Sequence, residues 1–175
     1  MKKNTEKDVI IKLYEESLND IIWTHKIQAT LLDEYTEKNK RLKTAKEIIV
    51  GLSGFISVIS IYFNLITIAI ISSGLSCVAV IVDGIFRISN YEDKINITKQ
   101  NVNELWLMKK LLSYNKEYLK SDIITWSEAK QILEEATEQR KEIYSKLETA
   151  TDRVINKAKN KLLERKDEEI NKEFF

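Results

Sequence analysis

A run of 35 residues without one charged side chain, Ile48 to Val82, constrains this chain more than any other feature, because 31% of its residues are charged. Crossing the ~30 Å hydrocarbon core of a bilayer takes about 20 apolar residues in a helix, so the run suffices for two crossings if the chain turns near its middle. Asn64 is the most polar residue of the run and lies close to its centre. The sequence therefore predicts a transmembrane helical hairpin, with residues 45–63 crossing and residues 65–86 returning.

Two other environments would accept an uncharged hairpin. One is the buried centre of a soluble helical bundle, but a helix of a soluble protein usually keeps a polar face, and here only small hydroxyls relieve the apolar residues. The other is a soluble α-helical pore-forming toxin that inserts into a membrane later. The length of the run favours a resident membrane hairpin over both.

The composition predicts an all-α protein. The chain has no proline, and its four glycines lie between Gly51 and Gly84, so the flanking segments lack the strongest helix breakers. The net charge of +1 argues against a nucleic-acid partner, which would require a basic surplus. With one histidine, one cysteine (Cys77) and no phosphate loop, we expect no metal, no cofactor and no enzyme activity.

Regular apolar spacing predicts a long cytoplasmic helix before the hairpin. Apolar residues follow alternating spacings of three and four over residues 7–46, as in a coiled coil. Two polar residues, His25 and Gln28, lie on this seam. Polar seam residues often fix the register of packed helices, and we favour that role for His25 over a pH sensor.

Two more helices are predicted after the hairpin. In the helix expected over residues 91–120, seam residues recur every seven positions: Thr98, Leu105, Leu112 and Leu119. Thr125 and Glu128 fit a capping box, which opens another helix that we expect to extend over residues 126–170. The predicted organisation is an N-terminal cytoplasmic helix (1–44), the hairpin (45–88) and C-terminal cytoplasmic helices (89–175), with the cytoplasmic helices in a coiled-coil-like bundle.

Basic residues indicate the orientation of the hairpin. They gather next to the predicted inner ends of its helices, whereas its turn carries no charge. Because positive residues mark the cytoplasmic side, we expect both termini in the cytoplasm and the turn of the hairpin on the opposite side of the membrane. The membrane-interface charges are Lys38, Lys40, Arg41, Lys43, Lys46 and Arg87.

The polar residues of the hairpin fall on one face of each helix. The first stripe consists of Ser53, Ser57, Ser60 and Asn64, and the second includes Ser72, Ser76 and Asp83. Two roles are compatible with these stripes. Small hydroxyl residues allow membrane helices to pack closely, and polar stripes also line channels, which a two-helix hairpin encloses only by oligomerising.

Asp83 is the one acidic residue close to the membrane, and Arg87 follows it by one helical turn. The acid precedes the base by four residues, which is the favourable order for an ion pair on a helix. We expect these two residues to pair near the inner membrane surface.

The layout of the chain resembles the SLATT family. The resemblance extends over the run from Ile22 to Lys46, the hairpin from Ile48 to Phe86, and the stretch from Val102 to Tyr118. It implies a two-helix membrane effector associated with nucleotide-signalling enzymes and their sensors in anti-phage systems. Such effectors are thought to form pores or disrupt the membrane when triggered, which arrests or kills the infected cell.

Our main hypothesis is therefore a homo-oligomeric inner-membrane effector acting in abortive infection downstream of another sensor. Its partners would be the lipid bilayer, further copies of the chain and an associated sensor or nucleotide-signalling protein. The alternative is a non-conducting, membrane-anchored scaffold that binds a partner through its cytoplasmic coiled coil.

Overall fold

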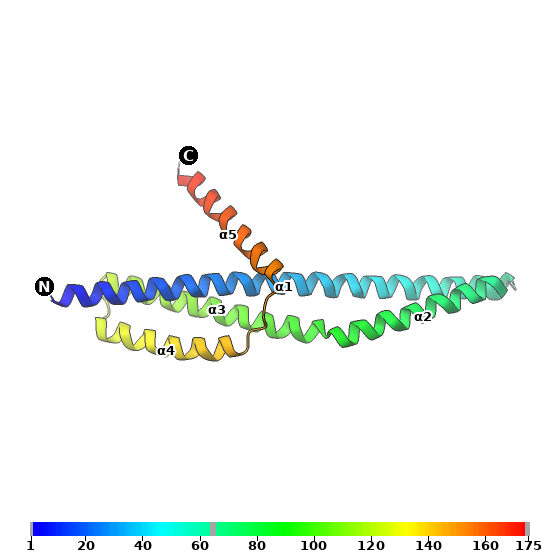
Figure 1. The fold of residues 1–175 in the computed structure, drawn as a ribbon, viewed down its shortest axis with the longest axis horizontal. Helices are drawn as coiled ribbons and strands as arrows, with labels where there is room; N and C mark the ends of the chain where they lie inside the picture. Colours follow the sequence, from blue (N-terminus) through cyan, green and yellow to red (C-terminus); the bar gives the residue numbers. More distant parts are fainter. Residues whose placement is uncertain (1, 64–65, 174–175) are drawn as a thin grey trace. The chain divides into compact units, whose positions relative to one another are not determined.

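The computed structural model describes residues 2–63 and 66–173, and its described residues form helices joined by short segments, with no strand among them (Figure 1). The expected all-α class is confirmed. The helices are α1 (Lys2–Phe63), α2 (Ile66–Ser89), α3 (Tyr91–Lys120), α4 (Trp126–Ser145) and α5 (Asp152–Glu173). The predicted turn residue, Asn64, lies outside the described residues.

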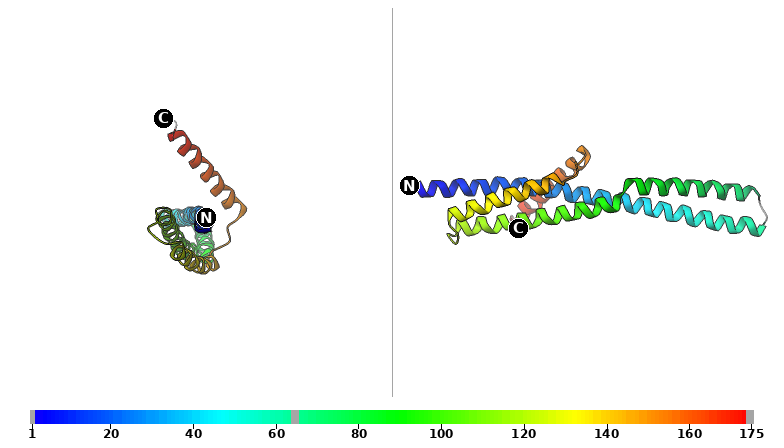
Figure 2. Two further views of the ribbon diagram at one scale, coloured as in Figure 1. Left: turned by 90° about the vertical axis from the view of Figure 1, so that its left-hand side faces the viewer. Right: turned by 90° about the horizontal axis from the view of Figure 1, so that it is seen from below.

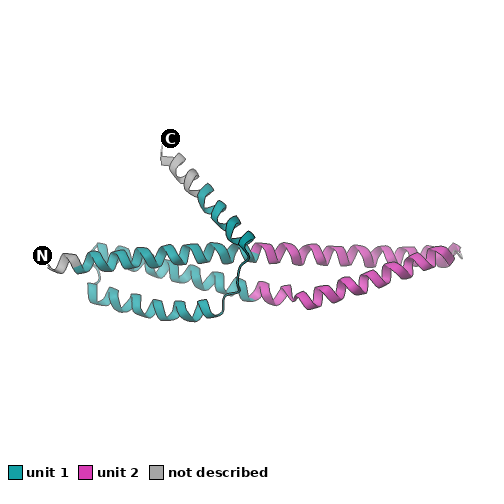
Figure 3. Cartoon of the chain, in the orientation of Figure 1, with its two compact units in different colours: residues 1–32, 97–175 teal, residues 33–96 magenta. Residues whose placement is uncertain are grey.

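The chain divides into two compact units (Figure 3). Unit 1 comprises residues 1–32 and 97–175, and unit 2 comprises residues 33–96. The long helix α1 contributes its first half to unit 1 and its second half to unit 2.

Unit 1 is built around an apolar core between α1, α3 and α4 (Figure 2). Asp20 of α1 pairs with Arg140 of α4, while Lys7 near the start of α1 pairs with Asp122 just after the end of α3, so α4 runs parallel and α3 antiparallel to α1. Each helix contributes four buried residues: Ile10, Tyr14, Leu18 and Ile21 from α1; Leu105, Met108, Leu112 and Leu119 from α3; Ala129, Leu133, Ala136 and Ile143 from α4.

Two sequence patterns of unit 1 predicted its structure correctly. The four residues of the seven-residue repeat in α3 are all buried, and α3 has the predicted bounds. The capping box is also present: the Glu128 amide donates to the Thr125 hydroxyl at 3.3 Å, and the Thr125 amide donates to the Glu128 carboxylate at 2.8 Å. The hydrogen bond from the Thr125 backbone favours the ionised carboxylate, so it lowers the pKa of Glu128.

The prediction of one helix over residues 126–170 was wrong. Helix α4 ends at Ser145 and α5 begins at Asp152. The side-chain amides of Gln28 and Asn101 reach the segment between them and donate to the carbonyl oxygens of Glu148 and Lys146. These bonds satisfy backbone groups that a continuous helix would have paired internally, and they come from residues distant in the sequence.

The hairpin of unit 2 consists of the second half of α1 and helix α2. A single residue, Asn90, separates α2 from α3, and its φ of 44° lies in the left-handed region, which asparagine tolerates better than most residues. Its side chain donates to the Asp93 carboxylate at 2.7 Å, at the start of α3. Helix α2 ends at Ser89, three residues beyond the predicted end at residue 86.

Candidate functional site

The hairpin has the reverse of a soluble protein's polarity. In residues 45–63 and 66–89, the buried residues are three serines: Ser53, Ser60 and Ser72. The large apolar side chains of the same helices face outward; Ile61 and Tyr62, for example, are each 81% exposed. Such an exterior is stable only where water is replaced by lipid or by other apolar surfaces.

Four of the predicted serines meet between the two helices of the hairpin. The Ser53 and Ser76 hydroxyl oxygens lie 2.7 Å apart, and those of Ser57 and Ser72 lie 2.5 Å apart. The Ser72 hydroxyl is also 3.0 Å from the Ser53 carbonyl oxygen, to which it can donate. Small side chains let the helix backbones approach closely, so these hydroxyls bond across the contact. We call these four residues the serine seam.

The remaining residues of the two predicted stripes lie at different places. Ser60 is buried in α1, one turn beyond Ser57, and Asn64 is outside the described residues. Asp83 lies at the other end of the hairpin, where its carboxylate bonds the Arg87 side chain at 2.9 Å, as predicted. The sequence analysis did not find its second partner, Lys46 of α1.

Lys46, Asp83 and Arg87 form a charge cluster at the end of the hairpin that lies away from Phe63 and Ile66. The Lys46 ammonium also lies 5.9 Å from the centre of the Phe86 ring, within range of a cation–π interaction. Between this cluster and the outer ends of the described helices, α1 and α2 each contribute seventeen residues, 47–63 and 66–82. That corresponds to about 25 Å of helix, close to the thickness of a hydrocarbon core. The cluster therefore lies where a charged group can reach the membrane surface.

The pairs across the hairpin follow a constant register. Residue numbers 46 and 83, 53 and 76, and 57 and 72 each add up to 129. Reflecting the sequence about the bond between residues 64 and 65 generates all three pairs. This symmetry is the signal that would have identified Lys46 as a partner of Asp83.

The other predicted interface charges lie along α1 before the hairpin. Lys38 pairs with Glu34 at 2.7 Å and Arg41 with Glu37 at 2.5 Å, each one helical turn apart. Lys38 and Arg41 are thus paired within α1, whereas Lys40 and Lys43 are exposed to the surroundings of the helix.

Two described helices are long and apolar enough to cross a membrane. The chain matches the model of the SMODS and SLOG-associating 2TM effector domain family 4 (SLATT_4) over residues 11–173. The chain belongs to the SLATT_4 family. It is accordingly a membrane effector of a family linked to nucleotide-signalling defence systems. No curated protein and no solved structure matches it.

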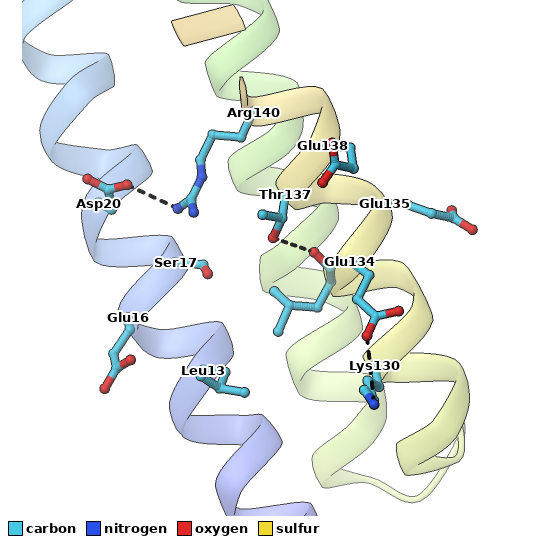
Figure 4. A pocket seen from close by; sticks show the side chains of 11 residues that line it. Leu13, Glu16, Ser17, Asp20, Lys130, Glu134, Glu135, Thr137, Glu138 and Arg140 are labelled. Atoms are coloured by element: carbon cyan, nitrogen blue, oxygen red, sulfur yellow. Dashed lines mark hydrogen bonds and ion pairs between the residues drawn. The ribbon is translucent and has the colours of Figure 1, made fainter. Parts of the chain in front are cut away.

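Unit 1 of this SLATT_4 chain has an acidic pocket of about 860 Å³ between α1 and α4 (Figure 4). Arg140 and Asp20 pair across it at 3.0 Å. Five carboxylates and two cationic side chains line it: Glu16, Asp20, Glu134, Glu135 and Glu138 against Lys130 and Arg140. Its net negative charge repels anionic ligands such as nucleotides.

The described residues offer few groups that could bind a metal ion or transfer a proton. Among them, no three His, Cys, Asp or Glu side chains lie close enough together to hold a metal ion. The Tyr14 hydroxyl is buried and donates to the Ala129 carbonyl at 2.8 Å, and its burial raises its pKa to about 12. Tyr14 is therefore a neutral core residue at physiological pH.

Proposed function

We propose that this SLATT_4 chain forms homo-oligomers in the bacterial inner membrane and makes the membrane leaky when a partner triggers it. The result would be growth arrest or death of an infected cell. The observation that carries the proposal is the inverted polarity of the hairpin, with hydroxyls inside and bulky apolar side chains outside. No catalytic step is part of this proposal.

Oligomerisation is proposed because one hairpin cannot enclose a conducting path. Two packed helices contact each other along one seam, and here that seam is filled by serine side chains. A path through the membrane needs several hairpins whose polar faces point to a common centre. The exposed apolar side chains would then divide between lipid and neighbouring copies.

The serine seam supplies the polar lining in this proposal. In the closed hairpin, the hydroxyls bond each other, which makes them compatible with a membrane interior. If the helices of one hairpin separate, the same hydroxyls become available to water and ions. Hydrogen bonds between membrane helices are worth only about 0.6 kcal/mol on average, so this exchange is energetically accessible.

The trigger in this proposal is a protein rather than a nucleotide bound in the acidic pocket. Five carboxylates against two cationic residues make that pocket unfavourable for a phosphate group. A protein partner, such as a nucleotide-binding sensor, can instead contact the wide helical surface of unit 1. The basic residues of α1 are consistent with unit 1 on the cytoplasmic side.

A leakage assay tests the role of the seam. The full chain would be reconstituted at high density in anionic lipid vesicles that contain a self-quenched dye, and the basal dye release that occurs without the trigger would be recorded. We expect Ser57→Leu combined with Ser72→Leu to reduce release at least tenfold, because leucine removes the hydroxyls and fills the seam. The matched control is Ser73→Leu, an exposed serine on the same helix as Ser72, which should release dye like the unmodified chain.

One result would contradict a path lined by the serine seam. If the doubly substituted chain inserts normally, as shown by resistance to alkaline extraction, and still releases dye at the original rate, the seam does not line the path. Induced expression in bacteria with a potassium-efflux readout would provide the same comparison in a cell.

One observation favours a second candidate function, that of a non-conducting scaffold. The seam hydroxyls are already paired, and the outer surface of the hairpin is apolar. In this case the hairpin is an anchor and the surface of unit 1 is the functional part. Replacing residues 45–88 by an unrelated two-helix hairpin distinguishes the candidates, because a scaffold would retain its effect on cells and a pore would lose it.

A further inference from the structure

The sequence of the break between α4 and α5 carries only a weak signal for a new helix: Thr151 lies at the N-cap position of α5, and its carbonyl accepts from the Ile155 amide at 3.0 Å. Residues 146–151 read Lys-Leu-Glu-Thr-Ala-Thr and contain neither glycine nor proline. Lysine, leucine, glutamate and alanine are good helix formers, and threonine is a weak former rather than a breaker. At Lys146 the backbone still has the right-handed conformation, with φ −98° and ψ −7°. The segment is therefore able to continue α4 as a helix.

The apolar pattern continues through the break in a single register. Ile143 and Val154 are eleven residues apart. Leu147, inside the break, lies eleven residues after Ala136 and eleven residues before Ala158. Eleven residues make three turns of a nearly straight helix, so these residues would share one face if α4 and α5 were joined. In the observed state Leu147 packs against the core from within the break.

Contacts from two other helices hold the break in place. The Gln28 side chain of α1 donates to the Glu148 carbonyl at 3.3 Å, and the Asn101 side chain of α3 donates to the Lys146 carbonyl at 3.5 Å. Both side chains are almost fully buried, yet both bonds are longer than is usual for N–H···O hydrogen bonds. The side-chain oxygen of Gln28 has no hydrogen-bond partner among the described residues. The break is thus fixed by weak, long-range contacts that a shift of α1 against α3 would remove.

We propose that residues 146–151 are a helix switch with a broken and a joined state. In the broken state, Gln28 and Asn101 hold the segment, and Val154 and Ala158 of α5 are fully buried in unit 1. In the joined state, α4 and α5 form one helix from Trp126 to Glu173, and the carbonyls of Lys146 and Glu148 accept hydrogen bonds within it. The switch itself is independent of conduction, whereas its role as the input of the effector rests on the proposed function.

Pulsed electron spin resonance on the full chain in nanodiscs tests the switch. With Cys77→Ser as background, spin labels would be attached through Gln139→Cys and Lys159→Cys, both exposed positions. A joined helix separates these positions by 20 residues, or about 30 Å along its axis. The unmodified segment should show mainly the distances of the broken state, with a small population near 30 Å.

Two independent changes should increase the joined population. Thr149→Ala combined with Thr151→Ala raises helix propensity at exposed positions without touching the core, and we expect the 30 Å population to rise at least threefold. Gln28→Leu combined with Asn101→Leu removes the holding bonds and should have a similar effect. Asn103→Leu, an exposed asparagine on α3, is the matched control and should leave the distances unchanged.

Proline provides the converse test. Ala150→Pro removes a backbone donor that the joined helix requires, so adding it to either double variant should abolish the 30 Å population. Distance distributions that do not change in the threonine variant would overturn the switch. A change there but not in the Gln28 and Asn101 variant would overturn the assignment of these two residues as the holding contacts.

Dye release from vesicles separates the switch from its role. If the joined population rises and release changes with it, the switch acts as the input of the effector. If the joined population rises while release stays constant, the input role is overturned. If the Ser57→Leu and Ser72→Leu variant releases no dye but still shows both helix states, the helix switch is independent of the seam. The switch and the proposed function can therefore be tested separately.

Discussion

Unit 1 and the hairpin of unit 2 are both made of packed helices, but they bury opposite kinds of side chain. The core of unit 1 is filled by leucine, isoleucine, tyrosine and alanine side chains, with charged residues outside. The contact between the hairpin helices contains serine hydroxyls, with isoleucine, valine and phenylalanine outside. One helix, α1, takes part in both arrangements.

The difference shows which force holds each region together. In water, burial of apolar area drives helices together at roughly 25 cal/mol per Å². Lipid chains are as apolar as leucine, so in a membrane that force is absent, and close packing of small residues with hydrogen bonds takes its place. Large apolar residues should therefore be essential in unit 1 and replaceable in the hairpin, and small polar residues should behave in the opposite way.

The largest effect is expected for Leu105→Ala in the core of unit 1. The Leu105 side chain is fully buried between three helices, and such truncations cost about 3 kcal/mol because they leave a cavity. Thermal unfolding of the full chain in detergent, followed by circular dichroism, would measure the loss. Leu107→Ala on the exposed side of α3 and Leu52→Ala on the outside of the hairpin are the controls. A loss of similar size for Leu52→Ala would contradict the comparison.

A smaller effect is expected for Thr125→Ala at the start of α4. This substitution removes the hydroxyl that accepts from the Glu128 amide, and loss of such a cap typically costs about 1 kcal/mol. Hydrogen exchange of the amides in the first turn of α4 should accelerate accordingly. Ser127→Ala, two residues further on and exposed, should leave exchange unchanged. Equal exchange in the two variants would mean that the capping box does not stabilise α4.

In the hairpin, Ser72→Ala tests whether a buried serine stabilises the helix packing, as buried leucine residues do in unit 1. It removes one interhelical hydroxyl without adding volume, and we expect a loss of about 0.6 kcal/mol. The measurement is the disulfide yield between Ser53→Cys and Ser76→Cys in a Cys77→Ser background, which should fall. Ser73→Ala is the matched control, since Ser73 is exposed. A yield that does not fall would show that apolar packing alone holds the hairpin.

The smallest effect is a pH dependence in unit 1 that the hairpin should lack. Burial lowers the pKa of His25, with further lowering by the charges of Lys109 and Lys26. The unfolded chain therefore binds a proton first, and stability should be lost as the pH falls below about 6.5. The denaturation midpoint of unit 1 should be lower at pH 5.5 than at pH 7.5. Replacement by His25→Gln should remove this difference, and an unchanged difference would assign it to other groups.

The sequence predicted those parts of the fold that depend on local patterns. The uncharged run located the hairpin, the seven-residue repeat located the buried face of α3, and Thr125 with Glu128 located the start of α4. It also placed the hairpin serines on one face of each helix, and in the structure four of them meet in the seam. In each case the residues that determine the structure are neighbours in the sequence.

The parts that were missed depend on residues far apart in the sequence. The side chains of Gln28 and Asn101 bond the segment that follows α4, and residues 146–151 contain neither glycine nor proline to mark the end of that helix. The pairing of Lys46 with Asp83 depends on the register of the hairpin, which the stripes alone do not specify. A constant sum of residue numbers would have supplied that register, since the position of the turn was already predicted.

The placement of the hairpin within the chain also has a consequence for biosynthesis. The two parts of the unit 1 core are separated by the hairpin; Tyr14 and its partner Ala129, for example, are 115 residues apart. At typical elongation rates, the ribosome takes roughly 6 to 23 s to synthesise that interval. The hairpin thus leaves the ribosome and can reach the bilayer before the core of unit 1 is able to close. Membrane insertion is expected to precede folding, and until then the first half of α1 would depend on chaperones to shield its apolar seam.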